Sequence, residues 1–410
     1  MRRRYSSIVF VIVGVGMGAM SIIPLQGFCQ LPLGFSVWSK DSEKSDQYIL
    51  AAPFYGDTNF EGTGTIQLID TQGVPVHTWW TPHPVLSAYL SPDGTVTASM
   101  TPPLDSKDYP SPGGTTGLIQ KIDWDGNVLW EYRDNRMALD FEILPDGRIM
   151  YIRWHPAPES FARDVRGGMD TATTSVWTNE LVVVNAYKQI EWTWKFEDHV
   201  DPRSYTVSPL VPKVDWAHMN SVRYIVDNPI THTPAYLVSV RHISTVFMID
   251  TEDGAILWES PRGMFSLQHD ATLTKSGTIL VFDNGLFRDH PVPAVISRVV
   301  EIDPRKNSVV WEFTGGKSGL EKVQYSSSIM GGAQRLDSGN TLITVSMMND
   351  LYEVTSEGEI VWKYSNDFRD ADNRMYALFK VRAYDAANTA WGSRVSRNSL
   401  GHWKASMCQR

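Results

Sequence analysis

The chain of 410 residues has only two cysteines, Cys29 near one end and Cys408 at the other. If the first 29 residues are removed, only Cys408 remains, so we expect no intrachain disulfide. The sequence also lacks cysteine ligands for zinc, a His-x-x-x-His helix and a Walker loop. The common zinc-site and nucleotide-phosphate motifs are thus absent, and we expect neither a metal nor a cofactor.

Clusters of basic residues are missing as well. The formal net charge is −9, and it becomes −12 without residues 1–29, because Arg2, Arg3 and Arg4 are the only charges there. An acidic surface without basic clusters argues against nucleic-acid binding. A small anionic substrate remains compatible with this charge, since a few local arginines suffice to bind one.

Beyond residue 29 no long hydrophobic run suggests a membrane span, but the N-terminus has one. The three arginines precede an apolar run, residues 8–25, and Gly27, Phe28 and Cys29 follow. This is the layout of a secretory signal peptide, and the run is also about long enough for a membrane anchor. Residues 1–29 are therefore expected to be a signal peptide or an N-terminal anchor. We accordingly expect the protein to be periplasmic or secreted, or else tethered to the membrane by this segment.

The remaining sequence repeats one phrase six times: a β-run, Ile-Asp or similar, a turn, and a second β-run with a tryptophan. The tryptophans are 51 to 66 residues apart. They are Trp79, Trp130, Trp192, Trp258, Trp311 and Trp362. Repeats of this length, built from short alternating runs, are typical of a radial all-β array, because each hairpin must bury its apolar face against the next unit.

A second phrase, strand–turn–strand with glycine in the turn, falls between the tryptophan phrases, for example at residues 89–100 and 142–153. Each unit then has four strands, as a propeller blade requires. The sequence predicts an all-β, six-bladed β-propeller over residues 47–384, with residues 49–54 as an innermost strand. Residues 30–46 are expected to be a linker and 385–410 a C-terminal tail.

Equivalent positions of the blades bring several polar residues into register. Counted back from the glycine of each turn, His269 occupies the same place in its blade as Leu139 does in an earlier one. The third unit has His218 and Asn220 in a comparable stretch, and Arg241 with His242 ends its next strand. We expect His218, Asn220, Arg241 and His269 to meet at one mouth of the central channel.

This set suits a tetrahedral oxyanion. A guanidinium offers forked donors to sulfate or phosphate oxygens, and a neutral imidazole can attack the central atom and carry the group covalently. Metal binding is a rival, for which Asp270 beside His269 is the obvious acidic ligand. We expect Asp270 instead to orient a neighbour or to accept backbone N–H groups.

At these residues the chain resembles the bacterial arylsulfate sulfotransferases, six-bladed propeller enzymes of the cell envelope that do not use PAPS. The resemblance runs from about Gly64 to Tyr384. It is carried most specifically by residues 215–221 (DWAHMNS), 239–242 (SVRH), 268–271 (QHDA) and 331–336 (GGAQRL). It implies a transfer from an aryl sulfate to a phenol, with His269 transiently sulfated. His218, Asn220 and Arg241 would hold the sulfate oxygens, and His242, Asp270 and Arg335 complete the candidate substrate-binding set.

One position departs from the family, which usually has a His-Asp pair where this chain has Leu139-Asp140. A lost imidazole costs about 10² to 10³ in rate if it stabilised developing charge. The alternative hypothesis is therefore a non-catalytic propeller that binds a ligand or a partner. A quinoprotein-type dehydrogenase is a third option, against which six units rather than eight and the missing cysteine pair both count.

The other histidines are expected to have no part in chemistry. His77 lies within a β-run and is interpreted as structural. Five more fall in polar or proline-containing loops and are predicted to be solvated or rim residues: His83, His155, His199, His232 and His290. The sequence leaves the oligomeric state open.

Overall fold

The structure is a computed structural model. It describes residues 35–40, 43–54, 63–103, 113–169, 175–288, 296–316, 319–366 and 377–398. The predicted signal peptide or anchor and His290 lie outside the described residues. None of the helices within these ranges has the length and apolar character needed to cross a membrane.

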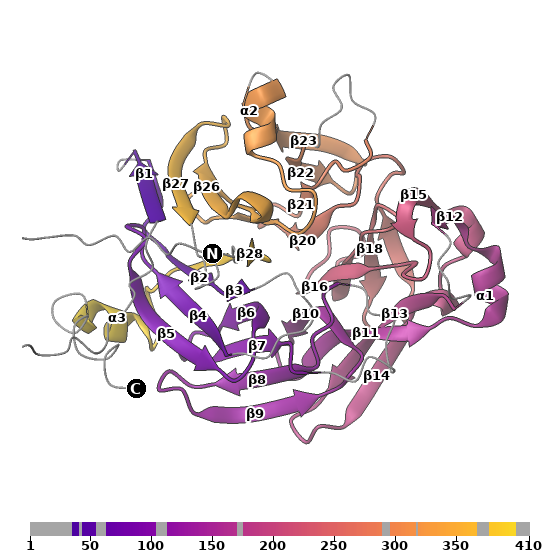
Figure 1. Ribbon diagram of the computed structural model, residues 1–410, viewed down its shortest axis with the longest axis horizontal. Helices are drawn as coiled ribbons and strands as arrows, with labels where there is room; N and C mark the ends of the chain where they lie inside the picture. Colours follow the sequence, from indigo (N-terminus) through magenta and orange to yellow (C-terminus); the bar gives the residue numbers. More distant parts are fainter. Residues whose placement is uncertain are drawn as a thin grey trace, which may run out of the picture.

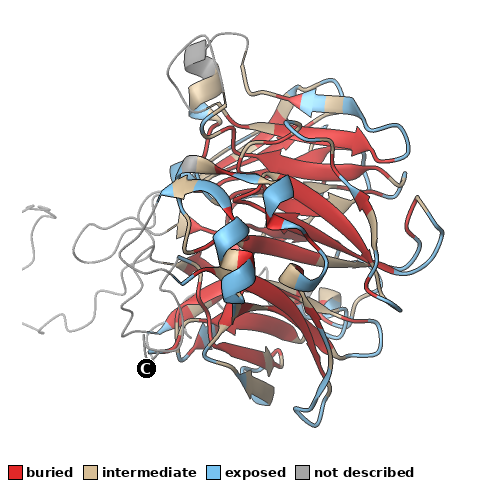
Figure 2. Ribbon diagram, turned by 90° about the vertical axis from the view of Figure 1, so that its right-hand side faces the viewer, coloured by how far each residue is buried: buried red, intermediate tan, exposed pale blue. Residues whose placement is uncertain are grey.

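Six antiparallel sheets stand around a common centre, which confirms the predicted six-bladed propeller (Figure 1). Four second strands are buried along their whole length: β7 (Val96–Met100), β17 (Ala235–Val240), β21 (Ile279–Asp283) and β25 (Thr341–Val345). Outer strands such as β9, Val128–Arg133, and β23, Ser308–Phe313, are mostly exposed or half-buried. Figure 2 shows the buried residues along the strands inside the blades and the exposed ones mainly in turns and at the periphery. A middle strand is covered on both faces by neighbouring blades, so it consists of a continuous run of small and apolar residues such as AYLVSV in β17.

The first three blades follow one another along the chain, and each runs from an inner to an outer strand. The first has β6 (Val85–Leu90), β7 (Val96–Met100), β8 (Leu118–Ile122) and β9. The second has β10 (Met137–Ile143), β11 (Ile149–Pro156), β13 (Trp177–Val184) and β14 (Ile190–Lys195). The third has β16 (Met219–Ile225), β17 (Ala235–Val240), β18 (Thr245–Asp250) and β19 (Ile256–Glu259).

The last blades close the ring. The fourth has β20 (His269–Leu273), β21 (Ile279–Asp283), β22 (Arg298–Asp303) and β23. The fifth has β24 (Gly332–Arg335), β25 (Thr341–Val345), β26 (Asp350–Val354) and β27 (Ile360–Asn366), with β1 (Phe35–Ser39) added outside β27. The sixth has β29 (Arg382–Tyr384), β2 (Tyr48–Ala51), β4 (Gly64–Ile69) and β5 (Pro75–Thr81).

The sixth blade therefore joins both ends of the described chain, and it corrects one prediction. Residues 49–54 were expected to form an innermost strand, but β2 is the second strand, and β29 from the C-terminal part takes the inner edge. The pattern of the sequence could not distinguish the two, because β29 has only three residues, Arg-Ala-Tyr, and lies far along the chain from β2.

Tryptophans link the blades in a circle. In every blade one indole Nε1–H of the fourth strand, counted from the centre, donates to the turn before the fourth strand of the next blade. The pairs are Trp79–Asp123, Trp130–Ala186, Trp194–Gly254, Trp258–Asn307, Trp311–Ser356 and Trp362–Thr71, at 2.7–2.9 Å. In the second blade the donor is Trp194, two residues after the tryptophan that the repeat predicts. Trp192 instead packs against Tyr236.

Short elements cover the ends of the blades. Two-stranded pairs form between β3 (Pro53–Phe54) and β28 (Ala377–Leu378), and between β12 (Arg166–Met169) and β15 (Thr206–Pro212). The helical segments are α1 (Glu159–Asp164), α2 (Gly319–Gln324), α3 (Gly392–Asn398), η2 (Phe196–Asp198), η3 (Pro202–Ser204) and η4 (Ser346–Met348). Trp391, just before α3, is buried and stacks on Trp124, so the described part of the predicted tail packs on the ring.

Candidate functional site

Five predicted residues gather where β16 and β20 begin and β17 ends. We call them the histidine cluster: His218, Asn220, Arg241, His242 and His269. The backbone N–H of Arg241 donates to the carbonyl of His218 at 3.1 Å, and the His218 and His242 rings stack with centroids 4.4 Å apart. Asn220 reaches the next blade, where its Nδ2 donates to the carbonyl of Gln268 at 2.7 Å, directly beside His269.

β-bulges shape the strands that carry these residues. The pairing of β16 with β17 slips between Met219 and Ser221, and that of β20 with β21 slips between His269 and Thr272. His218 and Asp270 have positive φ angles of 51° and 53°. Bulges redirect side chains away from the regular alternation of a strand, and they are frequent beside active sites. Here they send His269 and Asp270 into different surroundings although the two are neighbours in sequence.

The ring of His269 is held in one tautomer by Asn284, which follows β21. Nδ1 of His269 lies 2.7 Å from Oδ1 of Asn284. The amide orientation is fixed, because its Nδ2 donates to the carbonyls of Ser327 and Met330, both at 2.8 Å. Oδ1 must then accept, so Nδ1 of His269 carries the proton and Nε2 keeps its lone pair. That lone pair accepts a long hydrogen bond from the backbone N–H of Met330 at 3.3 Å.

Asp215 orients the other two imidazoles. Its Oδ2 lies 2.5 Å from Nδ1 of His218, and its backbone carbonyl lies 2.5 Å from Nδ1 of His242. Both rings therefore present Nδ1–H to Asp215 and turn Nε2 away from it. A base whose second nitrogen is held by a carboxylate is the arrangement that general acid–base catalysis requires.

The same three residues are also the place to test for a metal, since their ligand atoms all lie within 4.8 Å of one another. Two ligands of one tetrahedral zinc ion stand about 3.3 Å apart. The 2.5 Å between Asp215 Oδ2 and His218 Nδ1 is a hydrogen-bond distance instead. Arg241, whose charge acts on both His218 and His242, further disfavours a cation here.

Burial and the Arg241 charge keep the imidazoles neutral. His269 is 3% exposed and Arg241 7%. Burial, assisted by Arg241, holds the pKa of both His218 and His269 well below the usual value. Burial also lowers the pKa of Arg241, to about 10, so the guanidinium still carries its charge at neutral pH. The cluster thus combines neutral imidazoles with one cation.

Some buried polar atoms of the cluster are available to a ligand. Within the part of the chain that the structure describes, Arg241 Nε, Asn220 Oδ1 and Asp215 Oδ1 are buried without a hydrogen-bond partner. Such atoms cost free energy unless something pairs with them. Arg241 Nε is the donor that fits an oxyanion, and the arrangement is one that can bind a tetrahedral anion beside a neutral imidazole.

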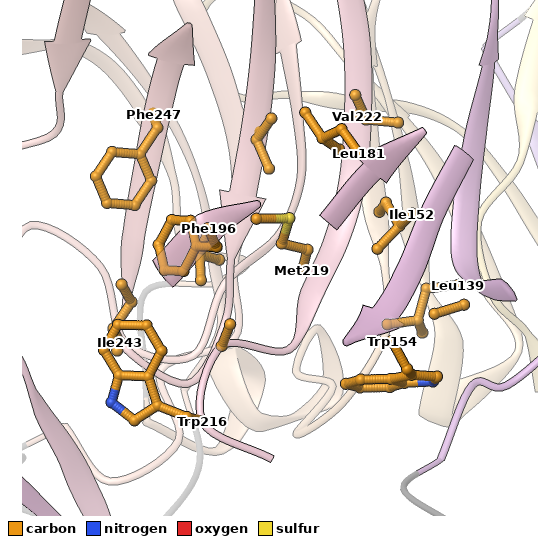
Figure 3. Close-up of a cluster of buried hydrophobic side chains, with 14 of the residues drawn as sticks. Leu139, Ile152, Trp154, Leu181, Phe196, Trp216, Met219, Val222, Ile243 and Phe247 are labelled. Carbon is orange, nitrogen blue, oxygen red and sulfur yellow. The ribbon is translucent and has the colours of Figure 1, made fainter. Parts of the chain in front are cut away.

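Leu139, the residue that departs from the family pattern, is an apolar side chain in apolar surroundings. It is 4% exposed, has a φ of 49°, and lies beside Trp154 in a buried apolar cluster (Figure 3). Phe379 belongs to the same cluster. Trp154 in turn packs against His218, and Phe379 against His269. Leu139 therefore belongs to the apolar cluster whose aromatic members contact His218 and His269.

Asp270 lies in a second group of charges, which we call the channel charge cluster: Asp140, Arg223, Asp270, Lys380 and Arg382. Arg382 Nη1 lies 2.9 Å from Asp270, and the backbone N–H of Ala333 donates to Asp270 at 3.1 Å. Although burial acts to raise it, the charges of Arg382 and Lys380 hold the pKa of Asp270 well below its usual range. Both oxygens are thus occupied by cations and a backbone donor.

The remaining predicted residues lie apart from the histidine cluster. Arg335 pairs with Glu301 and stacks over Trp311, and so makes its contacts with the fourth blade. Nε2–H of His77 donates to the Trp124 carbonyl, and the His77 ring stacks on the Trp124 ring, as a structural residue does. His155, expected to be a solvated loop residue, lies in β11 and pairs with Glu180 and Glu197; the alternating pattern around it was missed.

Sequence reasoning gave no role to Asp215 or Asn284. Asp215 stands in the quoted motif three residues before His218, and that spacing is a usable signal. Asn284 ends the run ILVFDN, in which a polar pair follows an apolar strand. Its partner is set by how two strands and a loop of the next blade meet, which a single sequence does not specify.

The chain matches one protein family and is similar to several solved structures. The family model described as Arylsulfotransferase (ASST) matches residues 106–367. No curated protein matches the chain. Among solved structures, a protein of unknown function from Bacteroides caccae has 16% identity and a TM-score of 0.49, covering 83% of this chain and 99% of its own. Apo AztD from Citrobacter koseri has 9% identity and a TM-score of 0.43, covering 83% and 98%.

Proposed function

The chain belongs to the arylsulfotransferase (ASST) family, and we propose that it moves a sulfuryl group from an aryl sulfate ester to a phenol through a sulfated His269. The observation that carries the proposal is the fixed tautomer of His269. Asn284 holds the proton on Nδ1, so Nε2 is the nucleophile.

In the first half-reaction, the Nε2 lone pair of His269 attacks the sulfur of the aryl sulfate. An N–S bond forms, the S–O bond to the aryl group breaks, and the phenolate leaves with the electron pair. The Met330 N–H must first release Nε2, and it is then free to donate to a sulfate oxygen. Arg241 Nε, which is buried and unpaired among the described atoms, supplies a charged donor to the same oxygens.

In the second half-reaction, the oxygen of an acceptor phenol attacks the sulfur and the N–S bond breaks, which returns the electron pair to Nε2. The acceptor must lose a proton. His218 suits this role, because Asp215 holds its Nδ1–H and leaves Nε2 as a base. Asn220 supports the geometry through its bond to the Gln268 carbonyl.

Turnover tests this proposal. Purified protein with p-nitrophenyl sulfate should release p-nitrophenol continuously only when a phenol is supplied, because the sulfated enzyme needs an acceptor; without a phenol, release should stop after about one equivalent per enzyme. His269→Asn should lack this turnover while keeping the far-UV circular dichroism of the wild type. A matched control is His77→Asn, which removes an imidazole from another blade and should keep full activity.

Equal turnover in the wild type and His269→Asn would contradict the assignment of the nucleophile. No turnover in the wild type with any phenol would favour the alternative, a propeller of this family that binds without reacting. Leu139 is the observation behind that alternative, since it places an apolar side chain where the family usually has an imidazole.

A further inference from the structure

A cleft of about 720 Å³ opens between the first and second blades, away from the histidine cluster. We call it the basic cleft. Its basic side chains are Arg133, Arg136, Arg153, His155 and Lys195, and its two carboxylates are Asp134 and Glu180. Five basic side chains beside two carboxylates are unexpected in a chain of net charge −9.

The carboxylates of the basic cleft are already engaged within the protein. Asp134 accepts from Tyr151 Oη at 2.7 Å and from Arg153 Nη1 at 3.3 Å. Glu180 accepts from Arg153 Nε at 2.7 Å and lies 3.4 Å from His155. Arg153 and His155 are thus the partners of the two carboxylates, and Arg136 stacks over Trp177, which leaves Arg133 and Lys195 as the basic side chains considered for a ligand.

His155 adds to the positive charge rather than reducing it. Hydrogen bonds with Glu180 and with Glu197, the latter at 2.9 Å, raise its pKa to about 9. The imidazole is therefore protonated at neutral pH. Among the described residues, Arg133 from the first blade has a long contact of 3.8 Å with Glu131, and its side chain is half-exposed. Lys195 faces it from the second blade, since both residues line the same cleft.

The lining also indicates the kind of ligand. All the described residues that line the cleft are polar or charged types, and Asn135 and Thr193 add an amide and a hydroxyl. An aromatic ester would need a wall of apolar residues, and this lining has none among the described residues. Its volume is in the usual range of about 300 to 1,000 Å³ for small-ligand sites. A hydroxylated ligand with several anionic groups fits both the charge and the polarity.

The basic cleft and the histidine cluster use opposite faces of the same strands. On β11, Arg153 and His155 face the cleft, whereas Trp154 between them packs against His218. On β13, Glu180 faces the cleft, whereas Oδ1 of Asn179 accepts the backbone N–H of Met219. Successive side chains of a strand point to opposite faces, so the second blade separates the two sites.

We propose that the basic cleft binds an acidic saccharide of mono- or disaccharide size, carrying at least two sulfate or carboxylate groups. Arg133 from the first blade and Lys195 from the second would each pair with one anionic group, and Asn135 and Thr193 would bond hydroxyls. This inference is independent of the proposed sulfuryl transfer.

Isothermal titration calorimetry with a trisulfated heparin disaccharide tests it. We expect binding at about 50 mM NaCl that weakens at about 300 mM, because exposed charges are screened by salt. Lys195→Glu and Arg133→Glu should each weaken binding at least about tenfold, since each reverses a charge that pairs with an anion. The matched control is Lys275→Glu, an exposed lysine of the fourth blade that pairs with Asp337, and it should change binding less than about twofold.

Three results would overturn the proposal: no binding of the disaccharide, binding that Lys195→Glu and Arg133→Glu leave unchanged, or an equal loss in Lys275→Glu, which would indicate adhesion to the surface as a whole. Uncharged cellobiose should give no heat of binding, and binding as strong as that of the disaccharide would equally refute an anionic site.

Discussion

His269 and Asn284 form a pair in which the amide sets the tautomer of the imidazole, with Nδ1 and Oδ1 2.7 Å apart. The two carbonyls that accept from Asn284 belong to Ser327 and Met330, in the segment before the fifth blade. The orientation of the candidate nucleophile thus depends on contacts between two blades. Asn284 acts through His269 and is a positioning residue.

Replacing Asn284 should therefore affect the chemistry and not the fold alone. Asn284→Ala is expected to lower kcat by about ten- to hundredfold, since the ring loses its fixed tautomer. In Asn284→Asp a carboxylate accepts from Nδ1, which raises the pKa of His269, so the acid limb of the pH–rate profile should move up by about one unit.

Asn228→Ala is the control for this experiment, because Asn228 makes a comparable set of hydrogen bonds in the turn between β16 and β17. It should lower stability without moving the acid limb. If Asn284→Asp leaves the pH profile where it was, the amide has no influence on the protonation of His269.

The hydrogen bonds that tryptophans make between blades predict that substitutions of Trp192 and Trp194, both in β14, differ in their effect on stability. Trp194 is buried and donates to Gly254 at 2.8 Å, whereas Trp192 is half-buried and packs against Tyr236. Trp194→Phe should lower the free energy of unfolding by about 2 kcal/mol, from the lost hydrogen bond and the smaller ring. Trp192→Phe should cost less than about 0.5 kcal/mol. Urea denaturation measures both, and equal losses would argue against the indole–turn bond as the link between blades.

His155 makes a pH-dependent contribution to stability. Its pKa is raised to about 9 by Glu180 and Glu197, so its stabilisation is complete below the unfolded value of about 6.5 and is lost as the pH rises through about 9. His155→Gln should be less stable than the wild type by about 1–2 kcal/mol at pH 6, after allowance for partial exposure, and by much less at pH 10. His232→Gln, at an exposed histidine, is the control. If the difference in stability between His155→Gln and the wild type stays constant with pH, the pairing of His155 with Glu180 and Glu197 is contradicted.

The channel charge cluster should be intolerant of losing one carboxylate. Asp140 accepts from Lys380 at 2.6 Å, Arg223 at 2.9 Å and Tyr89 at 2.6 Å, and its side chain is fully buried. Asp140→Asn leaves buried cations without their partner and should cost about 3–5 kcal/mol. Asp337→Asn breaks an exposed pair with Lys275 and should cost less than about 0.5 kcal/mol. Similar small losses in both variants would mean that the cluster is well solvated.

Much of the fold was predictable because a propeller repeats its pattern. The turns with glycine and the apolar middle strands are local features, and they predicted six units of four strands. Two features were not predictable: that Trp194 rather than Trp192 donates the hydrogen bond to the next blade, and that β29 is the innermost strand of the sixth blade. Both depend on how one blade meets the next, and the repeat is equally compatible with either choice.

The same limit applies to the candidate site. His218, Arg241 and His269 were found from their equivalent places in the blades. Asn284 and Asp215 were not assigned roles, because the partner of an imidazole depends on bulges and loops. Arg335 lies in a motif with family likeness, yet it pairs with Glu301. The cations Lys380 and Arg382, far along the chain from Asp140 and Asp270, meet them only when the ring closes.

Mass spectrometry of the intact and digested protein after incubation with an aryl sulfate, without acceptor, tests the central claim most directly. The account predicts a gain of about 80 Da, the mass of SO₃, located on His269 and removed when a phenol is added. Release of the aryl alcohol with no adduct on this histidine, or an adduct that His269→Asn still acquires, would contradict it.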